Sequence, residues 1–161
     1  MNKITYKSIG TIHSPFKQPR GTPIQPPAAR CVQGSVEVFP EYTEGLQDLD
    51  GFSHIILIYH FHLAKSPSLT VQPFLDDRQH GVFAVRAPIR PNPIGLSVVR
   101  LVEIEENILY VEDLDVLDGT PLLDIKPYVP DFDACQVERT GWMEDNVYKL
   151  LASRDDGRFS E

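Results

Sequence analysis

Three histidines share one face of a β-favouring run in the middle of the chain. In residues 53–62 (SHIILIYHFH), a period of two puts His54, His60 and His62 on one face and the larger apolar side chains on the other. An imidazole can carry a proton near neutral pH, so His54 and His62 are the candidate general bases. No cysteine lies nearby and no carboxylate stands as an evident further ligand. Histidines that are hydrogen-bonded at the end of a barrel, or that touch a ligand there, are therefore favoured over zinc. We therefore predict no metal site.

A second feature is the proline ledge, residues 85–95 (VRAPIRPNPIG), which holds three prolines and two arginines. Proline fixes its own φ and pushes the preceding residue toward extended conformations, so a rigid loop is predicted, with Gly95 freeing the backbone at its end. The prolines lack N–H groups, so the ledge offers carbonyls, the Asn92 amide and the guanidinium groups of Arg86 and Arg90. Guanidinium groups pair well with carboxylates and phosphates. An ordinary proline-rich connector is the alternative interpretation.

The segment from Asp118 to Pro121 (DGTP) predicts a tight turn, because Asp-Gly combines a capping side chain with a residue that tolerates positive φ. No GxGxxG or GxxxxGK[ST] loop occurs, which argues against a dinucleotide-binding Rossmann fold and a P-loop. No serine lies in a nucleophile elbow, and neither cysteine has a recognisable activating context. A hydrolase is therefore disfavoured.

Charge is unevenly distributed along the 161 residues, whose net charge is −8. Residues 1–36 and 78–102 contain no acid, yet they carry nine of the 15 lysines and arginines. If these segments are neighbours in the fold, one positive face could attract a phosphate backbone; clustering by chance on separate surfaces is the alternative. Two distant cysteines, no secretory signal and no apolar run of membrane-spanning length favour a reduced cytoplasmic setting without a membrane.

The elements that would position these residues are short. Strand patterns separated by glycine and proline predict a mainly β domain, either a barrel or a sandwich. The expected strands cover residues 53–62, 81–86, 96–105 and 107–117, with a hairpin turn at 106–107 and one helical turn over 40–46. The apolar spacing of Val147, Leu150 and Leu151 predicts one short helix over residues 143–153.

Four long motifs, IGTIHSPF, GFSHIILIYHFH, GVFAVRAPIRPNPIGLSVV and DVLDGTPLLDIKPYVP, resemble the TsaA-like (TrmO) family. The resemblance implies a small, mostly antiparallel β-barrel with short helices, including one near the C-terminus. It implies a single domain over residues 1–161, with a motif-bearing core of about 4–130 and a tail of 131–161. It also implies a homodimer that binds S-adenosylmethionine without a Rossmann fold and methylates N6 of threonylcarbamoyladenosine at position 37 of transfer RNA.

The resemblance assigns site residues as well. Those expected to bind S-adenosylmethionine are Pro23, Ile24, Gln25, His62, Leu63, Arg86, Leu96, Leu114, Asp115, Asp118, Gly119 and Thr120. Those expected to bind the RNA substrate are Arg90, Asn92, Lys126 and Tyr128. The chain departs from the family at Ile24, where arginine is usual, and at Ala87, where serine is common. It also lacks the C-terminal extension of several bacterial members, so a weaker or differently arranged grip on transfer RNA is expected.

The chemistry requires positioning more than a reactive side chain. Methyl transfer from a sulfonium needs the attacking nitrogen in line with the S–CH3 bond, and orientation alone can supply much of the rate. An N–H next to a carbamoyl group is more acidic than that of plain adenine, so no strong base is required. Two alternatives stay open: a module that senses S-adenosylmethionine without transferring its methyl group, and an RNA-binding barrel without a cofactor.

Overall fold

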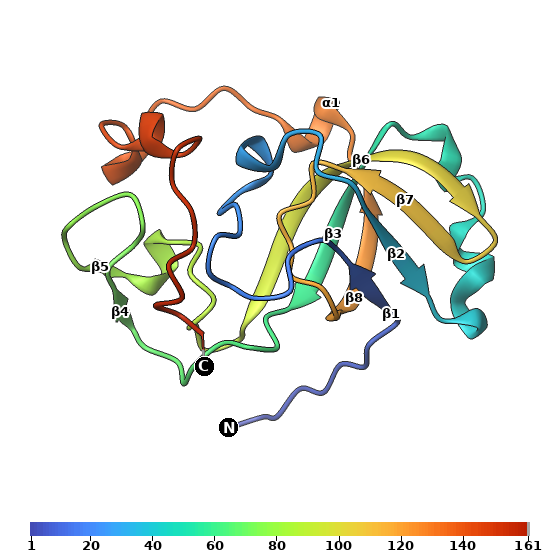
Figure 1. Cartoon of the computed structure of the whole chain (residues 1–161), viewed down its shortest axis with the longest axis horizontal. Helices are drawn as coiled ribbons and strands as arrows, with labels where there is room; N and C mark the ends of the chain where they lie inside the picture. Colours follow the sequence, from blue (N-terminus) through green and yellow to red (C-terminus); the bar gives the residue numbers. More distant parts are fainter. Residues whose placement is uncertain (161) are drawn as a thin grey trace.

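A closed, antiparallel, six-stranded barrel forms the body of the protein (Figure 1). The computed structural model describes residues 1–160. Around the barrel the strand order is β1-β2-β7-β6-β3-β8, and every neighbouring pair is antiparallel. The strands are β1 (Gly10–His13), β2 (Gly34–Val38), β3 (His54–His60), β6 (Ile94–Glu105), β7 (Ile108–Glu112) and β8 (Thr120–Pro127). The predicted mainly β barrel is confirmed.

The remaining elements are short. Strands β4 (Thr70–Val71) and β5 (His80–Gly81) pair beside the barrel. The one α-helix in residues 1–160 is α1 (Pro130–Asp133), and the 3-10 helices are η1 (Pro26–Ala29), η2 (Pro40–Leu46), η3 (Leu49–Gly51), η4 (Val82–Ala84), η5 (Gly141–Met143) and η6 (Val147–Lys149). None of the helices described is long and apolar enough to cross a bilayer.

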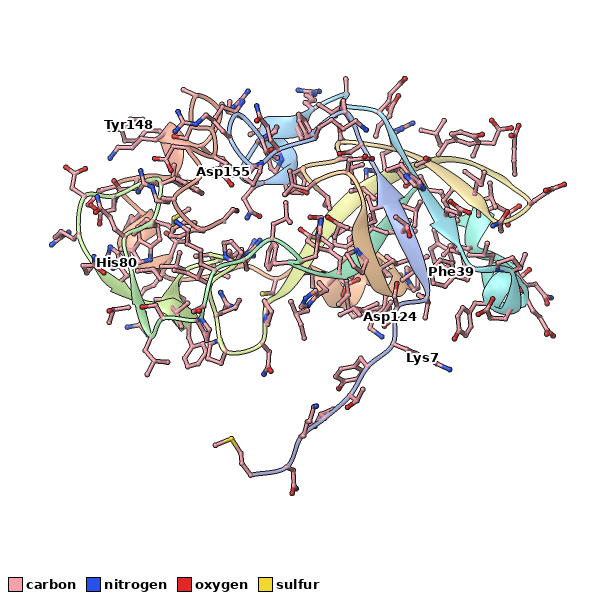
Figure 2. The ribbon with its side chains drawn as sticks, turned by 60° about the horizontal axis from the view of Figure 1, so that its bottom comes forward. Lys7, Phe39, His80, Asp124, Tyr148 and Asp155 are labelled. Carbon is pink, nitrogen blue, oxygen red and sulfur yellow. The ribbon has the colours of Figure 1, made fainter. Side chains whose placement is uncertain are left out.

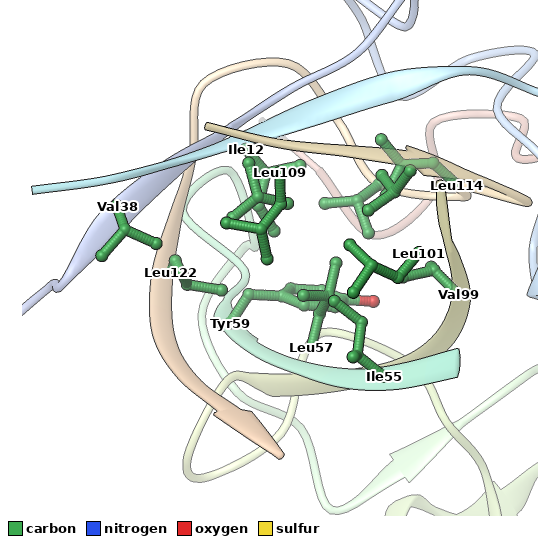
Figure 3. Packing of buried hydrophobic residues seen from close by; sticks show 13 residues of the cluster. Ile12, Val38, Ile55, Leu57, Tyr59, Val99, Leu101, Leu109, Leu114 and Leu122 are labelled. Atoms are coloured by element: carbon green, nitrogen blue, oxygen red, sulfur yellow. The ribbon is translucent and has the colours of Figure 1, made fainter. Parts of the chain in front are cut away.

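The alternation predicted for residues 53–62 is confirmed in β3. Ile55, Leu57 and Tyr59 point into the barrel and are at most 5% exposed, whereas the histidines of this strand are only partly buried. Figure 3 shows these three side chains packed against the inward residues of β6, β7 and β8. Strand β3 lies between β6 and β8, so Tyr59 is held inside the barrel near the end of the strand.

Hairpin β6–β7 is also as predicted, because residues 106–107 form the turn between two antiparallel strands. Glu106 takes the positive φ that this turn needs, and the Asn107 amide donates a hydrogen bond to the carbonyl of Val38. The helical turn expected over residues 40–46 is the 3-10 helix η2.

Three predicted elements are wrong in type or length. The expected strand over 81–86 is mostly the 3-10 turn η4, which the Arg90 side chain stabilises through backbone carbonyls. The expected strand over 107–117 ends at Glu112, because Asp113 adopts a left-handed conformation. The expected helix over 143–153 is broken into short 3-10 turns, and the Asn146 side chain bonds the carbonyl of Trp142 between them.

The last part of the chain, residues 135–160, forms a C-terminal strap. It runs back between the barrel and the β4–β5 pair (Figure 1), and Tyr148, Asp155 and His80 lie together on this side of the molecule in Figure 2. Backbone hydrogen bonds join Asp155 to Gly21 and to Thr22. Near its end Phe159 is buried and its ring meets that of Phe74 edge-on at 5.0 Å. The strap is therefore attached both to the loop at residues 21–22 and to Phe74.

Candidate active site

A cleft of about 1510 Å³ lies between the end of the barrel, the proline ledge and the C-terminal strap. Eleven of the predicted site residues, from five separate parts of the sequence, line it. They are Pro23, Ile24, Gln25, His62, Leu63, Arg86, Arg90, Leu96, Asp115, Thr120 and Tyr128. The fold thus brings most of the predicted site together.

Six predicted site residues do not line the cleft: His54, Asn92, Leu114, Asp118, Gly119 and Lys126. His54 begins β3 but does not line the cleft, and its Nδ1 lies 2.9 Å from the Ser53 hydroxyl. Leu114 is fully buried in the core, and Lys126 pairs with Asp124 at 2.7 Å. Lys17 and the Ser14 N–H both bond Asp118 and lower the pKa of its carboxyl. The structure does not bring these side chains to the cleft.

The two arginines of the proline ledge have different surroundings. Arg86 extends from the ledge, and its Nη1 donates a hydrogen bond of 3.0 Å to Oε1 of Gln25. Arg90 instead donates from Nη1 to the carbonyls of Val82, Val85 and Ala87, at 3.3, 2.7 and 3.2 Å. Arg90 therefore stiffens the ledge, a structural role that the sequence did not predict. Its contact with RNA stays a prediction.

Gly95 ends the ledge, but the reason for a glycine differs from the one expected. It lies within β6 and pairs with Tyr59, so freedom of the backbone is not what the position requires. A Cβ atom here would lie 2.6 Å from Cζ of Tyr59, closer still to Cε2, and 2.8 Å from Cζ of Phe61. The interpretation that Gly95 frees the backbone is wrong: the residue makes room for two aromatic rings.

A chain of hydrogen bonds leads from the barrel interior to the cleft. The Tyr59 hydroxyl lies 2.9 Å from Oγ of Ser97, and Ser97 donates a bond of 2.6 Å to Oδ1 of Asp115. Since the Ser97 hydrogen is used on the carboxylate, the Tyr59 hydroxyl is the donor to Ser97. Tyr59 and Ser97 are 5% and 1% exposed, and Asp115 lines the cleft.

Sequence reasoning missed Tyr59 and Ser97 as parts of the site. The signal was present: each is a polar group on the inward face of a strand whose other inward residues are apolar. A buried hydroxyl must find a partner, so two of them on adjacent strands point to a shared hydrogen bond. The register that makes them adjacent, with Leu57 opposite Ser97 and Tyr59 opposite Gly95, appears only in the folded barrel.

Burial sets the protonation of the cleft. It raises the pKa of the Asp115 carboxyl to about 6, although the Ser97 hydrogen bond and the Arg86 charge oppose the rise. Burial and then the Asp115 charge raise the pKa of Tyr59, which stays protonated. Burial and then His60 lower the pKa of His62, so its imidazole is neutral at pH 7. Its Nδ1 lies 3.4 Å from Oγ1 of Thr120.

The raised pKa of Asp115 makes a prediction about stability. The folded protein binds this proton more tightly than the unfolded chain, so stability falls as pH rises from about 4 to about 6. Asp115→Asn removes this dependence. Its free energy of unfolding relative to wild type should therefore increase over the same range, by up to about 3 kcal/mol. Urea denaturation at several pH values measures the difference, and a difference that is constant with pH would contradict the assignment.

The two acid-free segments meet at the cleft through the bond between Gln25 and Arg86. Of their nine cations, however, only Arg30, Arg86 and Arg90 line it. Three others are paired with acids elsewhere: Lys17 with Asp118, Arg78 with Asp76, and Arg100 with Glu112. The positive charge at the cleft is therefore local. Among residues 1–160, no cluster of three or more histidine, cysteine or acidic side chains is placed to hold a metal ion.

The C-terminal strap supplies a wall of the cleft that lies outside the predicted motif-bearing core. Trp142 lines the cleft, donates from Nε1 to the carbonyl of Ala84 at 2.8 Å, and stacks on His80 at 4.7 Å. Leu150 and Leu151 also line it, so the apolar face predicted for residues 143–153 exists although the helix does not. Ile24, next to the segment that pairs with the strap, contributes an apolar side chain to the cleft where the family usually has arginine.

Comparison with known proteins identifies close relatives. The chain is 64% identical over 156 residues to a probable S-adenosyl-L-methionine-binding protein of Pyrococcus abyssi, covering 97% of this chain and 85% of that protein. It is 34% identical over 140 residues to tRNA (adenine(37)-N6)-methyltransferase of Escherichia coli, covering 81% of this chain and 60% of that one. The crystal structure of TrmO from Pseudomonas aeruginosa superposes with a TM-score of 0.73 at 40% identity, covering 88% of this chain and 63% of that chain.

The chain thus spans most of the Pyrococcus protein but less than two thirds of the two bacterial ones. The model of the tRNA-methyltransferase O N-terminal domain matches residues 11–134, which hold the whole barrel except its first residue and end at the start of the C-terminal strap. The resemblance expected from the four motifs is confirmed: this chain belongs to the tRNA-methyltransferase O N-terminal domain family.

Proposed function

We propose that this protein is an S-adenosylmethionine-dependent methyltransferase that modifies N6 of adenosine 37 in transfer RNA, with threonylcarbamoyladenosine as its substrate. The observation that carries the proposal is the cleft itself. It gathers nine of the twelve predicted donor-binding residues, among them an arginine and a carboxylate, Arg86 and Asp115. The relatives named as S-adenosylmethionine-binding proteins and as tRNA methyltransferases support the same activity.

The residues of the cleft fit the donor chemically. When bound, S-adenosylmethionine supplies a methyl group on a positively charged sulfur. Arg86 retains guanidinium donors beyond the one used on Gln25, and these suit the carboxylate of the donor's amino-acid part. Apolar side chains such as Ile24 and Leu96 suit the faces of an adenine ring. The stiff ledge holds Arg86 in place, so binding the donor does not carry the entropy cost of ordering a loop.

The same cleft has groups suited to the nucleotide. Tyr128 and Trp142 offer aromatic surface for an unstacked base, which is how proteins commonly read single-stranded RNA. Arg30 is a further cation in the cleft, available for a phosphate or for the threonyl carboxylate of the modified base. The homodimer and the cytoplasmic location implied by the family resemblance remain expectations.

A second candidate is a module that binds S-adenosylmethionine without transferring its methyl group. Two observations favour it: only three of the nine cations in the acid-free segments line the cleft, and an archaeal relative from Archaeoglobus fulgidus is named simply as an S-adenosyl-L-methionine-binding protein.

Incubation with methyl-labelled S-adenosylmethionine and transfer RNA separates the two candidates. We expect label in transfer RNA that carries the threonylcarbamoyl group, and at least tenfold less in the same RNA lacking it. Mass spectrometry of the digested RNA should locate the methyl group at N6. Tight donor binding by calorimetry with no label in either RNA would contradict methyl transfer and support the sensing module.

A further inference from the structure

We propose that Asp115 is the catalytic group that takes the proton from the substrate amine, and that Ser97 and Tyr59 are positioning residues that aim its carboxylate. This inference rests on the proposed methyl transfer and deepens it. It replaces the sequence-based candidates, since His54 lies outside the cleft. His62 does line the cleft, but its side chain is exposed and bonds only the Thr120 hydroxyl, at 3.4 Å.

The Asp115 carboxylate is held at one oxygen and faces the cleft. Among residues 1–160, Ser97 is the only other residue that hydrogen-bonds the Asp115 carboxylate, and it uses Oδ1. The second oxygen accepts no hydrogen bond from another residue, so it can meet a ligand in the cleft that Asp115 lines. A general base must be within hydrogen-bond reach of the proton that it removes, and here Ser97 fixes one oxygen while no other residue engages the second.

The support behind Asp115 is rooted in the core. Ser97 is held from behind by the Tyr59 hydroxyl. The Tyr59 ring is confined by the backbone of Gly95 on one side and by the edge of Phe61, whose ring centroid lies 5.5 Å away at 87°. None of these contacts depends on the ligand, so the carboxylate is oriented before the substrate arrives. Such preorganisation is what a positioning shell provides.

The electrostatic surroundings suit proton removal near neutral pH. Arg86 on the ledge and Tyr59 on β3 are the titratable groups that couple to Asp115. Further charges in the same cleft are Arg30 and Arg90 on the loops, Asp113 next to the β7 end, and Asp133 and Asp155 toward the C-terminus; His62 is neutral at pH 7. A carboxylate with a pKa of about 6 is ionised at pH 7 and still more basic than an ordinary aspartate.

Methyl transfer and proton transfer together leave neutral products. The lone pair of the N6 nitrogen forms the new N–C bond to the methyl carbon as the S–C bond breaks, and the electron pair of that bond stays on sulfur, which becomes a neutral thioether. The N6 proton passes to the free oxygen of Asp115, which becomes a carboxylic acid. Release of this proton to water restores the carboxylate for the next cycle.

The test compares Asp115→Asn with wild type in single-turnover methylation of threonylcarbamoylated transfer RNA. We expect the rate to fall at least 100-fold, the usual contribution of a general base, while the donor Kd measured by calorimetry changes less than threefold. Glu112→Gln is the matched control, because this carboxylate does not line the cleft and contacts Arg100 instead. Its rate should match that of wild type.

The positioning roles of Ser97 and Tyr59 are tested by the pH dependence of the rate and by the titration of the Asp115 carboxyl. The wild-type rate should rise with pH through about 6, and Ser97→Ala should move this rise to higher pH, because the Ser97 bond lowers the pKa of Asp115. NMR titration of the Asp115 carboxyl without donor or RNA should give the same shift. Tyr59→Phe should move both curves in the same direction by less.

The proton acceptor, the positioning residues and the methyl transfer itself are tested by different outcomes. An Asp115→Asn rate within threefold of wild type, or a donor Kd that rises in proportion to the lost rate, would overturn the assignment while leaving the methyl transfer intact. An unchanged carboxyl titration in Ser97→Ala would overturn the positioning role. Absence of methyl transfer by the wild-type protein would instead overturn the proposed function, and the base assignment with it.

Discussion

Replacing Arg86 with alanine is expected to weaken S-adenosylmethionine binding about 10- to 150-fold, the effect of losing a hydrogen-bonded charge worth about 1.5–3 kcal/mol. Arg86 is the ledge arginine whose guanidinium is not used on backbone carbonyls; Arg90 is used in this way. Removing the Arg86 side chain leaves the carboxylate of the bound donor without its partner at the ledge. Calorimetric titration with the donor measures the effect.

Two further variants test whether the geometry of Arg86 matters as well as its charge. Arg86→Lys keeps a cation but loses the planar fork, so it should recover only part of the affinity. Arg100→Ala removes an arginine of the same acid-free segment that contacts Glu112 outside the cleft, and its donor affinity should equal that of wild type. Near-normal donor binding by Arg86→Ala would remove the ledge from the donor site.

The second large effect is expected from Gly95→Ala, which should destabilise the fold by about 3 kcal/mol, the upper range for overpacking a core. The added methyl group would collide with the rings of Tyr59 and Phe61, and the Tyr59 ring is only 5% exposed within the packed core. The melting temperature should fall by roughly 6–12 °C. Differential scanning calorimetry measures this change.

Gly45→Ala is the matched control, because no atom lies within 4 Å of the Cβ that it would add. It should leave the melting temperature within about 2 °C of wild type, since a surface substitution changes stability by about 0.5 kcal/mol or less. Equal melting temperatures for the two variants would mean that the Tyr59 ring is not confined by the ledge. The support proposed for Ser97 and Asp115 would then be lost.

The parts of the fold that sequence predicted correctly are those set by local pattern. The period of two in β3 and the hairpin at residues 106–107 depend on neighbouring residues, so each could be recognised within a short window. The errors have tertiary causes. Arg90 bonds the carbonyls of Val82, Val85 and Ala87 and favours a turn at 82–84. Asn146 interrupts the expected C-terminal helix through its side chain.

In the candidate site, too, some residues could be predicted from the sequence and others depend on tertiary structure. The resemblance to the family supplied residues from loops far apart in sequence, such as Gln25 and Arg86, which the barrel brings into hydrogen-bond contact. The chain from Tyr59 to Asp115 could not be predicted, because it depends on the register of β3 with β6 and on where the chain turns after β7. The wall formed by the C-terminal strap likewise depends on long-range bonds, such as that of Trp142 to Ala84.

The central claim is that the stiff proline ledge and the hydrogen-bonded carboxylate behind it form one binding site. A crystal structure with S-adenosylhomocysteine, the product left after methyl transfer, tests it most directly. We expect the amino-acid carboxylate of this molecule on Arg86, its sulfur on the side of the cleft that Asp115 lines, and an ordered ledge. A ligand bound elsewhere, or bound in the cleft without contact to Arg86 while residues 85–95 are disordered, would contradict the account.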